Sequence, residues 1–285
     1  MVRAIAFFEI RKSFRRISTY VYFVLFFSLA YLLFITAAGA FPSVDLAMGT
    51  GGKVFANSPY LLHSFIGALS YYGLLVTAAV MGHCAYQDFL HNVFPLFFTT
   101  PITRFQYLAG RFIAAAVVLL FVFSSIGLGC LAGSWMPFLD STLVDENRLS
   151  AFIQPYLVTV IPNMLFTGSL FFGLAALSRK ILPVYVSAVI LFIGYAIAAV
   201  LAQDMAGEFT AAVIDPFGNY ATEYVTQYWT VAEKNTLPIP MTGVFLLNRL
   251  LWLGVGAAVF GLTLYRFRFV QGGESGRRLR DAGVR

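Results

Sequence analysis

Apolar residues in this chain form long uninterrupted blocks, and polar residues gather between the blocks. Five stretches contain no Asp, Glu, Lys or Arg: 17–44, 54–87, 112–139, 149–178 and 181–203. A helix needs about 20 apolar residues to cross a bilayer, so each stretch is long enough for one span. A sixth stretch, 250–265, reaches that length if its helix starts near residue 243 and includes Arg249.

The block pattern predicts an all-α membrane protein with six transmembrane helices and an N-terminal interfacial helix. The expected spans are about 20–41, 60–85, 111–136, 155–177, 182–202 and 243–265. Residues 1–19 are expected to form a basic amphipathic helix on the membrane surface, with its cations on lipid phosphates. Its apolar stripe recurs every three or four residues, at Phe7, Ile10, Phe14, Ile17 and Val21. Residues 20–268 would form the membrane domain, and the Gly- and Arg-rich tail 269–285 is expected to be disordered.

Composition and charge support this class and give it an orientation. The chain is 59% hydrophobic and 11% charged, whereas soluble domains carry about 25% charged residues. Fifteen of the 19 Lys and Arg residues fall at the termini or in alternate loops, and the other four are Lys53, Arg148, Lys234 and Arg249. The positive-inside rule therefore places both termini in the cytoplasm. The net charge of +6 is then a signal of topology, and no nucleic-acid partner is expected.

Three features inside the blocks predict helix packing or irregularity. Ser125, Gly129 and Gly133 lie four residues apart, and such small residues let helices approach closely. This packing seam would lie within or between subunits, unless the spacing is chance in a Gly-rich membrane chain. Pro162, next to Asn163, is expected to break or kink its span. In the external segment, a turn at 215–218 should lead into a short aromatic-rich helix at the outer membrane surface.

Arg249 is the one formal charge expected to enter the membrane from the external side. Its side chain either reaches back to the outer headgroups, as long cationic side chains do, or pairs with Glu233 or with an anionic group of a bound substrate.

The stretch 86–111 is the one long connection between spans on the basic side, and we interpret it as a docking loop. A short helix over 88–94 would end at Pro95, and a new helix would start at Thr100-Pro101. Aromatic anchors dominate protein contacts, so the expected docking residues are Asp88, Phe89, Phe94, Phe97, Phe98 and Arg104. Asp88 would orient the loop by pairing with Arg104 or with a base on the partner. The alternative is an ordinary turn between helices, with the phenylalanines in the headgroup layer.

Several kinds of chemistry are disfavoured. His83, Cys84, Asp88 and His91 are close in sequence but scatter around a helix, so no metal site is expected. The zinc motif His-Glu-x-x-His and the serine motif Gly-x-Ser-x-Gly do not occur. No Asp or Glu sits in the middle of a span, which argues against ion-coupled transport. No catalytic residue and no cofactor are therefore expected in this chain, and Cys84 and Cys130 are interpreted as buried thiols.

The N-terminal FFEIRKSFRR, the acid after the second span and the segment TTPITRFQYLAGR together resemble the membrane subunit of type-2 ATP-binding-cassette (ABC) exporters. The external DPFGNYATEYVTQYWTVAEKNT and the following LLNRLLWL resemble a narrower group, the bacterial ABC permeases fused to a zinc aminopeptidase. Two departures are clear. Asp88 stands where the family has glutamate, and the fused proteins continue into further spans and a peptidase domain, so no peptidase activity is expected from these residues.

The resemblance implies a permease subunit in the bacterial inner membrane. Two such subunits, as a homodimer or heterodimer, would form the export pathway, and a separate cytoplasmic ATPase would bind ATP and dock on 86–111 and the N-terminal helix. Two alternatives remain open. One is a non-transport membrane scaffold or a partner module for an enzyme, and the other is a channel or carrier that works without ATP.

Overall fold

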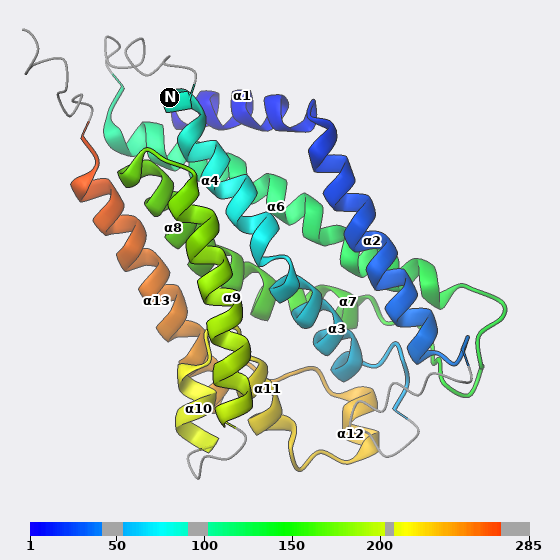
Figure 1. Ribbon diagram of the computed structural model, residues 1–285. Coiled ribbons are helices and arrows are strands. Elements are labelled where there is room, and N and C mark those ends of the chain that lie inside the picture. The colour runs from blue at the N-terminus through cyan, green and yellow to red at the C-terminus, as the bar shows by residue number, and fades with distance from the viewer. Residues whose placement is uncertain (42–53, 91–101, 203–207, 269–285) are drawn as a thin grey trace, which may run out of the picture.

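The computed structural model describes residues 1–41, 54–90, 102–202 and 208–268, with only the backbone described at 198–202. Every regular element in these ranges is a helix (Figure 1). Four helical segments are long and apolar enough to cross a membrane: α2 (Ile17–Ala37), α6 (Arg104–Ser134), the run Leu149–Ser178 and α13 (Gly243–Arg266). The chain is therefore a multi-pass membrane protein.

The fifth candidate crossing is a bent pair of helices. The sequence predicted one continuous span over 60–85, but the chain forms α3 (Pro59–Tyr72) and α4 (Leu74–Leu90), which meet at an angle of 51°. Gly73 ends α3 between them, and a Cβ there would overlap the Phe123 ring of α6. The bend therefore lets an aromatic side chain of a neighbouring helix approach the backbone, which the local apolar pattern does not reveal.

The remaining membrane-length helix is α9 (Leu182–Ala202), which matches the predicted range 182–202. Its described side chains, Leu182–Ile197, are mostly apolar. α9 packs against α4, where Val184 and Ile181 lie over Gly82.

The third predicted span, 111–136, starts too late. α6 begins at Arg104, after Thr103, whose hydroxyl accepts a hydrogen bond from the Gln106 amide at 3.3 Å. The Gln106 side chain in turn accepts from the Thr103 amide at 3.3 Å, which completes a capping box. The start predicted at Thr100-Pro101 is therefore wrong for this helix, and the Thr-x-x-Gln spacing was the signal that would have placed it.

The fourth span contains a π-helical turn just before Pro162, where the sequence predicted a break or kink. α7 (Leu149–Pro155) passes through one π-helical turn (η1, Tyr156–Val160) into α8 (Ile161–Ser178). The Tyr156 hydroxyl accepts from the Gly127 amide at 2.8 Å and donates to the Phe123 carbonyl at 3.0 Å. These two groups are four residues apart in α6, so the tyrosine inserts into the backbone hydrogen-bond ladder of its neighbour.

The N-terminal segment is two helices rather than one. α1 (Val2–Phe14) lies across the end of the bundle, and the chain turns at Arg15-Arg16 into α2 (Figure 1). The helix predicted over residues 1–19 ends earlier, at Phe14, so Ile17 and Val21 of the predicted stripe belong to α2. Phe7 is 69% exposed and Ile17 is 80% exposed, so these two positions do not pack on the rest of the protein. The buried side of α1, with Ala6 and Glu9, packs on α6.

Three short helices gather at the end of the bundle opposite α1, namely α10 (Glu208–Ile214), α11 (Asn219–Thr226) and α12 (Val231–Thr236) (Figure 1). The predicted turn at 215–218 joins α10 to α11, and Gly218 takes the left-handed conformation there, with φ of 78°. The C-terminal end of α13 lies at the same end of the bundle as α1 (Figure 1).

The small-residue seam of α6 packs inside the chain. A Cβ on Gly129 would overlap the Phe27 carbonyl of α2, and one on Gly133 would crowd the Phe34 ring at 2.8 Å. Ser125 is fully buried and donates to the Val122 carbonyl at 2.6 Å. These positions therefore hold α2 against α6, and they are covered against a second copy of the chain.

Leucine at Gly129 should lower the unfolding temperature of the purified protein, because its side chain would force α2 away from α6, and overpacking of this kind costs about 1–3 kcal/mol. Thermal unfolding in detergent measures the change. The matched control is Gly254→Leu in α13, where a Cβ meets nothing within 4 Å. Loss of self-association at an unchanged unfolding temperature would contradict the intrachain seam.

Candidate functional site

A buried ion-pair cluster joins α1 to α4 and α6, and we call it the α1 junction; it consists of Glu9, Gln87, Asp88, Tyr107 and Arg111. The Arg111 side chain is 2% exposed. Its Nη2 lies 2.9 Å from Glu9 Oε1 and 2.6 Å from Asp88 Oδ2. One guanidinium thus holds carboxylates from two other helices, which its planar fork of donors suits better than a lysine ammonium.

Most other polar atoms of the α1 junction are also engaged, although Arg111 Nε is buried without a hydrogen-bond partner among the described residues. Gln87 donates to Glu9 Oε2 at 2.7 Å, and the Tyr107 hydroxyl donates to Asp88 Oδ2 at 2.8 Å. Arg111 Nη1 donates to the Cys84 carbonyl at 2.6 Å. Lys12 of α1 donates to Gln87 Oε1 at 2.9 Å. This second cation offsets the excess negative charge of two carboxylates on one arginine.

Helix periodicity explains why these side chains meet. Cys84 and Asp88 are four residues apart in α4, and Tyr107 and Arg111 are four apart in α6, so each pair shares one helix face. Glu9 completes the set as the only acid of α1. Glu9, Gln87, Tyr107 and Arg111 were not among the predicted site residues. An acid within a strongly basic helix and a charge at the edge of each apolar block were the available signals.

The predicted docking residues that the structure describes do not form one surface. Asp88 is 4% exposed and pairs with Arg111, so its predicted pairing with Arg104 is wrong. Arg104 is exposed as the first residue of α6. Phe89 is half-buried, with the Arg179 guanidinium 5.2 Å from its ring centre. The other three, Phe94, Phe97 and Phe98, lie outside the described residues.

Replacing Arg111 by methionine should destabilise the protein by about 3–5 kcal/mol, because removing one member of a buried ion pair leaves uncompensated charge. Adding Glu9→Gln and Asp88→Asn to that variant should restore much of the loss. Denaturation in mixed detergent micelles measures both effects. The control is Arg104→Met, which removes an exposed arginine of the same helix. Equal effects of Arg104→Met and Arg111→Met would refute the assignment.

A second buried polar cluster, the Arg249 cluster, lies at the opposite end and comprises Asn163, Asp215, Asn248 and Arg249. Arg249 is 1% exposed. Its Nη1 donates to Asn163 Oδ1 at 2.8 Å and its Nε to Asn248 Oδ1 at 2.9 Å, and Nη2 also donates to that Asn248 oxygen. Amide oxygens of α8 and α13 thus take most of the guanidinium donors.

The Arg249 cluster also fixes the turn at 215–218, between α10 and α11. The Asn248 amide donates to the carbonyls of Ala212 and Asp215, both at 2.7 Å, and Asn163 donates to the Phe217 carbonyl at 3.0 Å. Burial raises the pKa of Asp215, and this is opposed by backbone hydrogen bonds to its carboxylate and by the charge of Arg249. The turn between α10 and α11 is therefore tied to two membrane helices.

Two of the partners predicted for Arg249, the outer lipid headgroups and Glu233, are wrong. The side chain does not reach back to the headgroups, because it is buried against Asn163 and Asn248. Glu233 is not its partner, since the Glu233 carboxylate accepts from the Thr230 amide at 2.7 Å and caps its own short helix. These hydrogen bonds lower the pKa of Glu233.

Replacing Arg249 by glutamine should loosen the turn at 215–218, because buried amide oxygens lose their donors at a cost of about 1–3 kcal/mol. Hydrogen–deuterium exchange in peptides covering 208–226 should rise relative to the wild type. The control is Arg148→Gln, at an external arginine whose side chain is 47% exposed. Unchanged exchange in both variants would show that the cluster does not hold the turn.

Comparison with known proteins adds no identification, because neither a family model nor a curated protein matches the chain. Within the described ranges, no three His, Cys, Asp or Glu side chains come together as metal ligands would. Two buried arginine clusters at opposite ends of a helical membrane bundle are therefore the evidence on which a function is argued.

Proposed function

We propose that this protein is the membrane-spanning permease subunit of a type-2 ABC transporter that exports its substrate. In this proposal two permease subunits form the pathway in a bacterial inner membrane, and ATP is hydrolysed on a separate cytoplasmic ATPase. The chain crosses the membrane six times, with the bent pair α3–α4 and α9 each counted as one span. The end of the bundle that carries α1 and the C-terminal end of α13 faces the cytoplasm.

The observation that carries the proposal is the α1 junction. α4 leads into residues 91–101 and α6 leads out of them, and α1 is fastened to both helices through Arg111. A force applied by a partner to α1 or to 91–101 would therefore reach two membrane helices together. A buried ion pair suits this role because its energy depends strongly on geometry, so α1 cannot slide without breaking it.

Two further features favour a partner as the energy source. The buried acids of the α1 junction, Glu9 and Asp88, lie at a bundle end and are both paired with one arginine. Proton-coupled carriers instead rely on ionisable groups within the membrane that take up and release protons. The positive side of the charge pattern also coincides with the end that carries α1 (Figure 1), as cytoplasmic docking requires.

Co-expression with the candidate ATPase tests the proposal. Single cysteines at 92 and 99 should crosslink to the ATPase, and a cysteine at 228, in the external segment, should not. The complex in proteoliposomes should hydrolyse ATP. A variant with Phe89 and Phe94 both changed to alanine should weaken the coupling between ATP hydrolysis and transport. ATP-independent flux would favour a channel or carrier, and a chain that purifies without any ATPase would favour a scaffold.

A further inference from the structure

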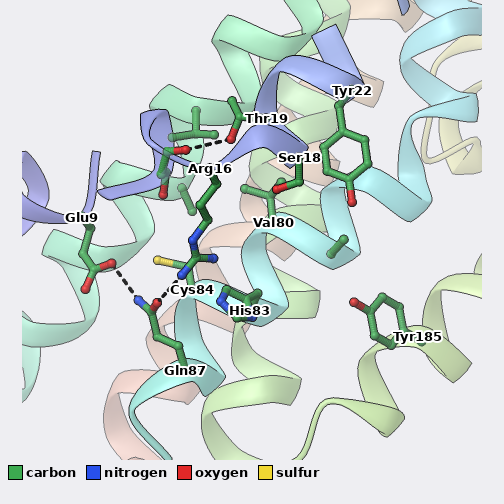
Figure 2. A pocket seen from close by; sticks show the side chains of 14 residues that line it. Glu9, Arg16, Ser18, Thr19, Tyr22, Val80, His83, Cys84, Gln87 and Tyr185 are labelled. Atoms are coloured by element: carbon green, nitrogen blue, oxygen red, sulfur yellow. Dashed lines mark hydrogen bonds between the residues drawn. The ribbon is translucent and has the colours of Figure 1, made fainter. Parts of the chain in front are cut away.

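A cavity of about 260 Å³ opens beside the α1 junction, where α1 turns into α2 (Figure 2). α2 packs against α6 and α9 packs against α4, so a groove remains between α2 and α9 with α4 and α6 as its floor. Tyr22 of α2 and Tyr185 of α9 stand on its two sides, and their hydroxyl groups point toward each other across it (Figure 2).

Two charged residues, Arg16 and Glu9, line this cavity. Arg16 extends into it and donates from Nη2 to Gln87 Oε1 at 3.2 Å, and Lys12 donates to the same oxygen. Glu9 also lines the wall, but its two oxygens already accept from Arg111 and Gln87. A guanidinium has five N–H donors, and the contact with Gln87 leaves others able to meet an anion in the cavity.

The start of α2 adds to this attraction. Ser18 and Thr19, in its first turn, line the cavity; the Thr19 hydroxyl donates to the Ser13 carbonyl at 2.9 Å, and no side chain caps the N-terminus of the helix. The first backbone N–H groups of a helix and its dipole favour an anion at that end. Arginine, hydroxyl groups and a helix N-terminus are together a typical environment for phosphate.

The chemistry of the walls changes along the groove. Near α1 the lining is polar, and farther along α4 and α6 it consists of Val80, Ala115 and Val118. A volume of 260 Å³ equals about nine water molecules at ~30 Å³ each, which suits a small headgroup but not a whole lipid. Acyl chains of a bound lipid would have to leave between α2 and α9, along the exposed side of Tyr185.

We propose that this cavity binds the phosphate of an anionic phospholipid, with Arg16 as its charged partner and the hydroxyls of Tyr22 and Tyr185 as further donors. Basic pockets between helices near the membrane surface are known to hold such headgroups. The site needs neither an ATPase nor a second subunit, so the inference stands apart from the proposed transport function.

The test is lipid binding to the purified full-length chain, titrated in detergent with phosphatidylglycerol and followed by native mass spectrometry. Arg16→Gln should weaken binding of the tightest lipid about tenfold, because a charge-assisted hydrogen bond is lost. The matched control is Arg11→Gln, at an exposed cation of α1, which should leave that lipid bound. Equal losses in both variants would reduce the effect to surface charge and overturn the proposal.

A second variant tests the site independently, in case Arg16→Gln lowers binding by misfolding. Tyr22→Phe with Tyr185→Phe keeps both rings and removes both hydroxyls, and it should weaken phosphatidylglycerol binding at an unchanged unfolding temperature. Unaltered binding in this variant and in Arg16→Gln would overturn the site. Inorganic phosphate distinguishes the source of the anion: if phosphate alone binds as tightly as the lipid and depends on Arg16, the lipid assignment fails.

Discussion

The structure depends on the burial of the Arg111 guanidinium between two carboxylates. Taking three charges out of water costs several kcal/mol for each ion, and attraction repays this only when the geometry is close to ideal. Glu9, Asp88 and Arg111 come from three different helices, so the position of α1 is determined by the relative position of α4 and α6. The α1 junction therefore contributes mainly to the specificity of the helix arrangement.

A second arginine, Arg249, is buried at the opposite end of the bundle, with different partners. Arg249 is buried among amide oxygens instead of carboxylates, and the asparagines that hold it also bind backbone carbonyls of the turn at 215–218. Gly218 is required there, because a Cβ would overlap the guanidinium. Between the two clusters the helices approach each other closely. Gly129 of α6 packs against α2, and Tyr156 of η1 contacts the backbone of α6. The two buried arginines thus lie at the ends of the bundle, and between them the helices meet through small residues and isolated hydrogen bonds such as those of Tyr156.

Properties that depend on local composition could be predicted from the sequence, and those that depend on neighbours could not. The apolar blocks located α9 and α13 almost to the residue, because hydrophobic length is a local property. The bend at Gly73 was missed, because its cause is the Phe123 ring of another helix. The end of the N-terminal helix was also missed, because the chain turns after Phe14 and places Ile17 and Val21 in α2. Asp88 was expected at a contact surface, and its burial follows from Arg111, 23 positions away, which no short motif connects to it.

One residue links the α1 junction to the cavity beside it. Gln87 donates to Glu9 within the junction and accepts from Lys12 and Arg16 at the cavity wall. An anion bound to the remaining donors of Arg16, as proposed, would share that guanidinium with Gln87. It would therefore change the electrostatic field at the Gln87 side-chain oxygen, while the Gln87 side-chain nitrogen holds Glu9. Coupling of this kind is reciprocal. Displacement of α1 would change the affinity of the cavity for an anion by the same factor by which a bound anion changes the free energy of displacing α1.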